Sequence, residues 1–326
     1  MDKKQKKHLL PAVRKAVQAV WGILQNGHLS GFVSGLTCAG PLKRFCVPGL
    51  NCYSCPGAVG ACPLGSLQAA LSAKKLKFPF YVLGFLLAAG VLLGRFVCGW
   101  LCLFGLIQEL LFKIPTKKLR IPPGLDGPLR FLKYAVLLIL AVLLPLALRD
   151  ESGMSAPYFC KLLCPAGTLE GGIPLLILNK ALRPAARFLW AWKFAVLLAV
   201  LAASVFIERP FCKYLCPLGA FYALFSKIGF LKIETDRGAC VKCGKCAALC
   251  PMQVDPAVSA NRAECIRCGA CVSACPTDAL RFVFIKGGSG KNARTARIPE
   301  DALADPACRP AETPSRTRSG SERSPS

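Results

Sequence analysis

Two cysteine-rich runs near the C-terminal end carry the clearest chemistry in this sequence. Residues 240–251 read CVKCGKCAALCP, and residues 265–276 read CIRCGACVSACP. Each run has the spacing C-x2-C-x2-C-x3-C-P, in which three close thiolates can wrap one corner of an iron–sulfur cubane. Gly244 and Gly269 let the backbone bend around the inorganic sulfides. The spacing therefore predicts two [4Fe–4S] clusters.

The fourth cysteine of each run is predicted to cross to the other cluster. One cluster is then held by Cys240, Cys243, Cys246 and Cys275. The other is held by Cys265, Cys268, Cys271 and Cys250. Zinc is the alternative, because zinc ribbons also use paired C-x2-C units, but two complete runs that both end in proline favour iron–sulfur. Basic residues lie among these ligands and either form a solvated surface or attract an acidic redox partner: Lys242, Lys245, Arg262 and Arg267.

A second cysteine motif lies in apolar sequence. Residues 94–114, GRFVCGWLCLFGLIQELLFKI, align without gaps on residues 208–228, ERPFCKYLCPLGAFYALFSKI. Each copy holds a C-x3-C pair with an arginine three residues before it, although Leu103 stands where the second copy has proline. This match indicates an internal duplication. Shorter copies are CKLLCPAG at 160–167 and CPLGSLQ at 62–68.

The duplicated pairs are predicted to bind one further iron–sulfur cluster through Cys98, Cys102, Cys212 and Cys216. Four thiolates are the normal complement of a cubane, and thiolates without a metal are costly near hydrocarbon. Arg95 and Arg209 could offset the negative charge of this site. A second site would use Cys52, Cys55 and Cys62 with Cys160 or Cys164. The alternatives are that these cysteines are small packing residues or form disulfides.

The composition is typical of a membrane protein. Of the 326 residues, 54% are hydrophobic and 18% are charged, and the apolar residues come in blocks. The net charge is +25, and residues 1–233 hold 28 of the 42 Lys and Arg but only 7 of the 17 Asp and Glu. These basic residues flank apolar runs, where they can face anionic lipid headgroups, and they form no polar stripe for nucleic acid. The two histidines argue against a haem with two His ligands, and the chain length argues against a disulfide scaffold.

The apolar blocks predict four transmembrane helices, near residues 12–35, 78–97, 129–148 and 188–207. If the basic N-terminus is cytoplasmic, four crossings return the cysteine-rich module to the cytoplasm. The duplicated cysteine pairs then lie at the inner face, and the remaining group lies at the outer face. Glu208 is expected to pair with its neighbour Arg209 at the membrane edge.

Changes in composition divide the chain into three parts. They are a transmembrane region at 1–232, a double-cluster module at 233–286, and a polar tail at 287–326 that is predicted to be disordered and contains Cys308.

The cysteine motifs resemble those of the polytopic membrane ferredoxins of bacteria. That family includes the membrane subunit of periplasmic nitrate reductase systems and the membrane regulators of nitrous oxide reduction. The resemblance covers about residues 20–285 and rests on NGHLSGF, NCYSCPGAVGACPLGSLQ, the C-x3-C repeats and both long runs. It implies an α-helical polytopic membrane protein with a C-terminal bacterial-type 2[4Fe–4S] ferredoxin domain.

We therefore expect a plasma-membrane protein that passes electrons between a cytoplasmic redox partner and quinone or an extracytoplasmic redox protein. We expect an electron-transfer subunit rather than a stand-alone oxidoreductase. The alternative is a cluster-based redox sensor or a maturation factor for a partner reductase. Expected partners are membrane lipid and redox proteins, either flavin-bearing or of the acidic ferredoxin or flavodoxin type. Quinone is a further candidate, and no nucleic acid is expected.

Overall fold

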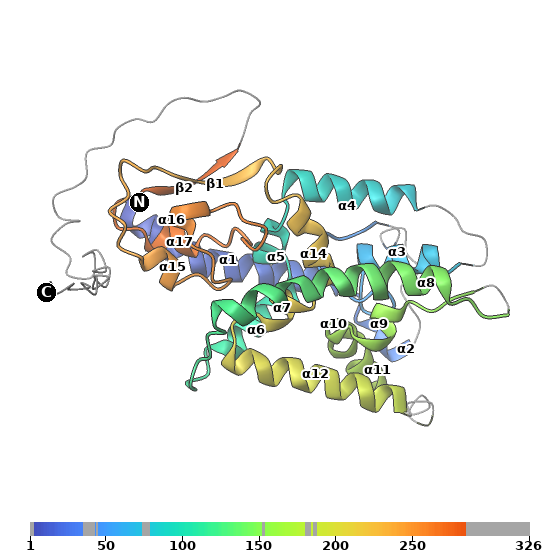
Figure 1. Cartoon of the computed structure of the whole chain (residues 1–326). Helices are drawn as coiled ribbons and strands as arrows, with labels where there is room; N and C mark the ends of the chain where they lie inside the picture. The colour runs from blue at the N-terminus through green and yellow to red at the C-terminus, as the bar shows by residue number, and fades with distance from the viewer. Residues whose placement is uncertain are drawn as a thin grey trace, which may run out of the picture.

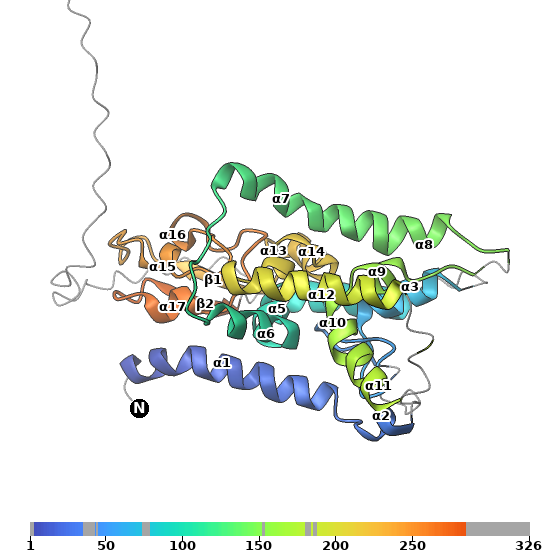
Figure 2. The same cartoon turned by 90° about the horizontal axis from the view of Figure 1, so that it is seen from below.

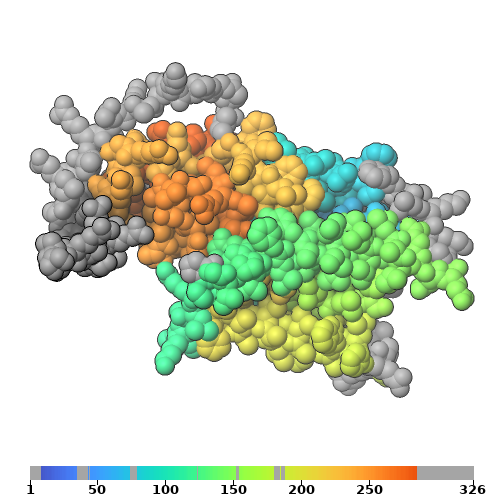
Figure 3. Space-filling view, in the orientation of Figure 1, coloured from blue at the N-terminus to red at the C-terminus, as the bar shows by residue number. Residues whose placement is uncertain are grey.

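The structure is a computed structural model that describes residues 3–34, 43, 45–73, 79–151, 154–179, 184 and 188–284. The predicted tail at 287–326, with Cys308, lies outside the described residues. Figure 1 shows an elongated, mostly helical molecule with a small two-stranded module at one end. In the space-filling view of Figure 3, this module (orange) packs directly against the helical part.

Long helices run lengthwise through the molecule, as Figures 1 and 2 show. They are α1 (Lys3–Gln25), α4 (Phe80–Leu92), α7 (Pro123–Val136) with its continuations η2 (Leu137–Leu143) and α8 (Leu144–Ala147), and α12 (Phe188–Phe206). Two stretches in the described part of the chain are long and apolar enough to cross a membrane, Gly124–Ala147 and Phe188–Phe206. Only 22% and 17% of their most apolar windows are buried, so most of these apolar side chains face outward.

Two of the predicted helix boundaries are wrong. The first helix begins at Lys3 and ends at Gln25, and a separate short helix, α2 (Ser30–Ser34), follows. The predicted helix at 78–97 is broken, because Gly94 adopts a positive φ of 55° between α4 and α5 (Phe96–Trp100). A Cβ at Gly94 would lie 2.6 Å from Nη1 of Arg267, so the break admits an arginine from the cysteine-rich module.

The cysteine pairs occupy a repeated local structure. A short helix carries the first cysteine, an extended residue follows as the second cysteine, and another helix begins directly after it. The helix pairs are α5 with α6 (Leu103–Phe112), α9 (Tyr158–Leu162) with α10 (Pro165–Gly167), and α13 (Pro210–Tyr214) with α14 (Pro217–Leu224). The helical path of α10 continues through η3 (Thr168–Gly172) and α11 (Ile173–Leu178). Cys62 precedes α3 (Pro63–Leu71) in the same extended conformation.

The C-terminal module is a two-stranded sheet with three short helices. Strands β1 (Leu231–Thr235) and β2 (Leu280–Phe284) pair antiparallel, with Leu231 opposite Phe284. Between them lie α15 (Lys245–Ala248), α16 (Pro256–Ser259) and α17 (Ala270–Ala274). Gly244 and Gly269 precede α15 and α17 with φ of 75° and 80°, a conformation that favours glycine, as the sequence predicted for these bends. The module lies beside the N-terminal half of α1 (Figure 2).

Candidate iron–sulfur sites

The C-terminal module brings together the two predicted thiol sets. The first set lines an open cavity of about 610 Å³ whose basic lining residues are Arg237, Lys242 and Lys245. Its thiols are those of Cys240, Cys243, Cys246 and Cys275. The second set lines a small cavity on the side of the module that meets the helices, and its thiols are those of Cys250, Cys265, Cys268 and Cys271. In both cavities the fourth thiol comes from the other cysteine run, as the crossed pattern requires.

A third cavity lies inside the helical part and is lined by the two duplicated pairs, Cys98, Cys102, Cys212 and Cys216. These four residues are only 5% to 8% exposed. Gln108 donates a hydrogen bond from Nε2 to the sulfur of Cys212 at 3.2 Å. Gly49 and Leu50, from the loop before Cys52, complete the wall of this cavity. Residues far apart in the sequence therefore converge on one four-thiol space.

Two buried arginines lie beside this cavity, and each contacts the other copy of the repeat. Arg95 donates from Nη2 to the carbonyl oxygen of Cys212 at 3.2 Å, and Arg209 donates from Nη1 to that of Cys98 at 2.7 Å. Each arginine thus reaches from its own copy of the repeat to the first cysteine of the other copy. A Cβ at Gly105 would lie 2.9 Å from Nη1 of Arg209, so this glycine provides room for the crossing.

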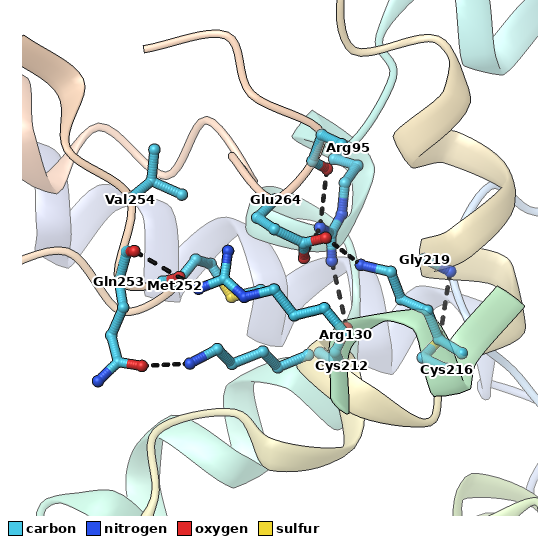
Figure 4. Close-up of polar contacts among 12 residues, drawn as sticks. Arg95, Arg130, Cys212, Cys216, Gly219, Met252, Gln253, Val254 and Glu264 are labelled. Atoms are coloured by element: carbon cyan, nitrogen blue, oxygen red, sulfur yellow. Dashed lines mark hydrogen bonds and ion pairs between the residues drawn. The ribbon is translucent and has the colours of Figure 1, made fainter. Parts of the chain in front are cut away.

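The two arginines are each paired with a carboxylate. Glu264 of the module accepts from Arg95 at 2.8 Å and from Lys133 at 2.5 Å, as Figure 4 shows for Arg95. Burial alone would raise the pKa of Glu264, but Arg95 and Lys133 hold it below its ordinary value, so its carboxyl group is charged. Glu109 accepts from Arg209 at 2.9 Å and from Arg14 at 2.8 Å. Four cations against two carboxylates leave excess positive charge beside the cavity, which suits a set of thiolates.

The module is docked so that the second thiol set lies against the third. Arg267 donates to the carbonyl oxygens of Leu93 and Ser226, each at 2.8 Å, at the ends of α4 and α14. Trp100 donates from Nε1 to the carbonyl oxygen of Arg267 at 3.0 Å. A Cβ at Gly99 would lie 2.4 Å from the carbonyl oxygen of Ile266, so the two backbones are in close contact. The loop that carries Cys265 and Cys268 therefore rests on α5.

A sulfur–glycine contact that the sequence-based analysis missed recurs in all four short motifs. The sulfur of Cys164 accepts from the backbone N–H of Gly167 at 3.4 Å, and that of Cys216 accepts from Gly219 at 3.3 Å. Cys62 and Cys102 receive the same kind of bond from the glycine three residues on. A sulfur at a helix N-terminus is stabilised as thiolate. The detectable signal is C-x2-G, as in CPLG, CLFG, CPAG and CPLG.

The remaining predicted ligands gather at the end of the molecule away from the module, around α3, α9 and α10 (Figures 1 and 2). They are Cys52, Cys55, Cys62, Cys160 and Cys164. Glu170 accepts a hydrogen bond from the backbone N–H of Cys52 at 3.1 Å, and its carbonyl oxygen accepts from the thiol of Cys55 at 3.4 Å. All of these cysteines are free thiols in the structure.

The donor chemistry of these sites fits iron–sulfur clusters. Within the described ranges, no three His, Cys, Asp or Glu side chains converge closely enough to hold a single metal ion. Each set instead surrounds a space with sulfur, which is the ligand that these clusters use. Backbone N–H groups donate to the sulfurs, and arginines donate to the carbonyl oxygens of the cysteine residues.

The expected pair of Glu208 with Arg209 is wrong, because Arg209 pairs with Glu109. Glu208 instead lines a separate cavity of about 410 Å³, together with Lys118, Arg120 and Cys250. Burial, and to a lesser extent the nearby Glu109, raises the pKa of Glu208 to about 7.

Comparison with known proteins identifies the same regions. A family model described as "4Fe-4S binding domain" matches residues 78–122 and again residues 188–234. A second model with the same description matches residues 258–281. No solved structure matches the chain.

Curated relatives extend this result. The chain is 34% identical over 50% of its length to an uncharacterized protein of Methanocaldococcus jannaschii, covering 61% of that protein. It is 30% identical over 50% of its length to the putative electron transport protein YccM of Escherichia coli, covering 43% of it. It is 32% identical over 56% of its length to the regulatory protein NosR of Pseudomonas aeruginosa, covering 24% of it. The chain spans about half the length of the first relatives it matches.

The fold, the thiol sets and these matches define the class: this is an iron–sulfur protein that carries [4Fe–4S] clusters. The resemblance to the membrane ferredoxins is confirmed by these matches, because the similar proteins include one named as a putative electron transport protein and one named as a ferredoxin-type protein.

Proposed function

We propose that this protein is an integral membrane electron-transfer subunit that passes electrons between a cytoplasmic redox partner and quinone or an extracytoplasmic redox protein. The observation that carries the proposal is the succession of three four-thiol sets, with the second docked against the third through Arg267 and Gly99. When bound, [4Fe–4S] clusters take up and release single electrons.

The proposed ligands follow the thiol sets. They are Cys240, Cys243, Cys246 and Cys275 for the first cluster, Cys250, Cys265, Cys268 and Cys271 for the second, and Cys98, Cys102, Cys212 and Cys216 for the third. All four thiols of the first set line one open cavity of about 610 Å³, and basic side chains line that opening. The surface around this set is therefore the proposed docking site for an acidic ferredoxin, a flavodoxin or a flavin-bearing protein.

The protein matrix positions these sets and controls their charge. Arg95 and Arg209 hold the backbones of the two repeat copies together and place positive charge beside the third set. The Arg95–Glu264–Lys133 group joins the module to the helices at the same point. Rigid docking keeps neighbouring sets close, which electron transfer over short distances requires.

The proposed topology has four crossings of the plasma membrane, with both the N-terminus and the ferredoxin domain in the cytoplasm. The lengthwise course of α1, α4, α7–α8 and α12 supports it, as does the contact of α1 with the module. The proposed domains are the transmembrane region at 1–232, the double-cluster domain at 233–286 and the tail at 287–326. Internal duplication is supported by the same family model matching twice. Reporter fusions after Leu148 and after Leu231 should report opposite sides of the membrane.

A redox sensor or maturation factor for a partner reductase is the second candidate, favoured by the similarity to a protein named as regulatory. Reductive titration with membrane quinones separates the two. Reversible reduction with turnover supports electron transfer, whereas a slow conformational response without turnover supports a sensor.

The central experiment is anaerobic purification of the full chain with iron and sulfide analysis. The double variant Cys98→Ser, Cys212→Ser should lower the iron content while keeping about eight irons in the ferredoxin domain. It should also stop electron transfer to membrane acceptors. Unchanged iron together with unchanged transfer would refute the third site, and stoichiometric zinc with no visible absorbance would refute the ferredoxin clusters.

A further inference from the structure

We propose that Cys52, Cys62, Cys160 and Cys164 bind a further iron–sulfur cluster at the end of the molecule opposite the ferredoxin domain. The sequence suggested three cysteines of the 52–62 loop with one from the 160–164 pair, whereas the structure favours two from each segment. None of the four lies in a region matched by the family models. The inference rests on the proposed function, since it extends the same electron path.

The four cysteines gather in one region. Cys62 and Cys164 lie in one buried core, and Cys160 packs against that core. An ideal Cβ at Gly167 would lie 3.5 Å from the sulfur of Cys52 and 3.6 Å from that of Cys164, so these two sulfurs flank one glycine. Thiols contributed by two distant segments thus face a common space.

The local structure repeats that of the third set. Cys62 and Cys164 stand before α3 and α10 in the extended conformation that Cys102 and Cys216 adopt before α6 and α14. Cys160 lies four residues before Cys164, where Cys212 lies relative to Cys216. The equivalent position before Cys62 is Ala58, which has no thiol. Cys52 then supplies the fourth ligand from the preceding loop.

Glycines leave room around Cys52. A Cβ at Gly171, one helical turn after Gly167, would lie 3.3 Å from the sulfur of Cys52. A side chain at Gly171 would crowd this sulfur and contact the Cβ of Cys55, and a side chain at Gly167 would be in contact with the sulfur, so two glycines on one helical face keep the space beside it open.

Cys55 differs from the four proposed ligands in its hydrogen bond. It packs with Phe32 and Ala58 in a small core that also contacts Cys52, but its thiol donates to the carbonyl oxygen of Glu170 at 3.4 Å. Cys46 lies near Cys62 but its thiol bonds with Ser66. These two thiols therefore serve as comparisons and are excluded from the ligand set.

The proposed site and the third set share one buried core. Tyr222 is fully buried and belongs to the same core as Cys62, Cys98 and Cys216. Its hydroxyl donates to the carbonyl oxygen of Pro48 at 2.9 Å. A cluster at the proposed site would therefore continue the succession of sets along the molecule.

The test uses the full-length protein, purified anaerobically and reconstituted with ferrous iron and sulfide. Cys160→Ser and Cys164→Ser should each lower the iron content by about four irons per chain. The matched controls Cys46→Ser and Cys55→Ser alter buried thiols of the same region and should leave the iron content unchanged. Low-temperature electron paramagnetic resonance of the reduced protein should lose one signal in the first two variants only.

The outcomes separate this inference from the proposed function. If Cys55→Ser loses the irons and Cys160→Ser keeps them, the ligand set is wrong. A disulfide between any two of the four cysteines in the reconstituted protein, found by mass spectrometry, would overturn the site. If these variants show no loss while Cys98→Ser, Cys212→Ser does lose iron, only this inference fails. If no variant loses iron, the third site of the proposed function fails as well.

Discussion

At the scale of single residues, the buried charges around the third thiol set are the most consequential feature. Arg95 and Arg209 are fully buried, and each pairs with one carboxylate and donates to one cysteine carbonyl oxygen; Arg95 also donates to the carbonyl oxygen of Ala263. Breaking such a pair by removing one partner is costly, because the remaining charge stays buried without compensation. These arginines therefore couple the stability of the helical part to the electrostatics of the site.

We predict that Arg209→Gln destabilises the protein by about 3–5 kcal/mol, since Glu109 would lose its buried ion pair with Arg209 and keep the one with Arg14. The reduction potential of the adjacent cluster should also fall, because a positive charge is lost. Thermal unfolding in detergent and a redox titration measure the two effects. Arg281→Gln, which removes an exposed pair with Glu234, is the control and should cost less than about 1 kcal/mol. Equal effects of the two changes would contradict the prediction.

Glu208 provides a test by pH. Its pKa of about 7 lies above its ordinary value of 4.5 because of burial and Glu109, partly offset by Arg209, Arg14 and Arg120. Between these two values the folded protein binds more protons than the unfolded chain, so stability falls as pH rises through this window. We predict that Glu208→Gln removes this fall. The variant should melt at a higher temperature than the wild type at pH 8 and at a similar one near pH 5. If the melting temperatures of the variant and the wild type change with pH in the same way, Glu208 does not have this role.

At the scale of elements, the short helix pairs decide how the module docks. α5 follows a break at Gly94 and presents Gly99 to the backbone of Ile266. A continuous helix through this region would carry the chain past the module, whereas the break turns α5 toward it. The positive φ of Gly94 and the missing side chain of Gly99 are therefore both needed for the contact.

We predict that Gly99→Ala loosens the module, because its methyl group would lie 2.4 Å from a backbone oxygen that cannot move alone. Limited trypsin cleavage after Lys227 or Lys232 should become faster, and the magnetic interaction between the second and third clusters should weaken. Gly84→Ala is the matched control, since a Cβ there meets nothing within 4 Å. It should be neutral or slightly stabilising, by up to about 1 kcal/mol. Similar cleavage rates in both variants would count against the docking contact.

At the scale of the whole molecule, the arrangement has a direction. The open first set and the N-terminus lie at one end, and the cysteines around α3, α9 and α10 lie at the other, with apolar helices between them (Figures 1 and 2). An acidic electron partner that approaches this end of the molecule would meet the basic surface around the first set.

We predict that Lys242→Glu slows reduction by an acidic donor such as reduced flavodoxin about tenfold at low salt, because electrostatic steering is lost. The difference should shrink as ionic strength rises. Stopped-flow absorbance of the clusters measures the rate. Arg149→Glu, an exposed charge at the opposite end, is the control and should have no effect. If Lys242→Glu leaves the rate of cluster reduction unchanged, the donor docks elsewhere on the protein.

Local patterns in the sequence determined much of this protein. Cysteine spacing predicted the two thiol sets of the module, because ligands of one cubane must be close along the chain or cross in a regular way. Repeated C-x3-C pairs likewise predicted which four cysteines share a cavity in the helical part. Apolar length predicted helices, since about 20 residues are needed to cross a bilayer.

Only the tertiary structure decided the contacts between distant segments. The reciprocal crossing of Arg95 and Arg209, the pairing of Glu109 with Arg209 in place of Glu208, and the neighbours of Cys52 all join residues with no fixed spacing in the chain. The break at Gly94 also depends on Arg267, which lies far along the sequence and fills the space that the break creates. Spacing along a chain determines which ligands can share a local motif, whereas burial and charge pairing depend on which surfaces the fold brings together.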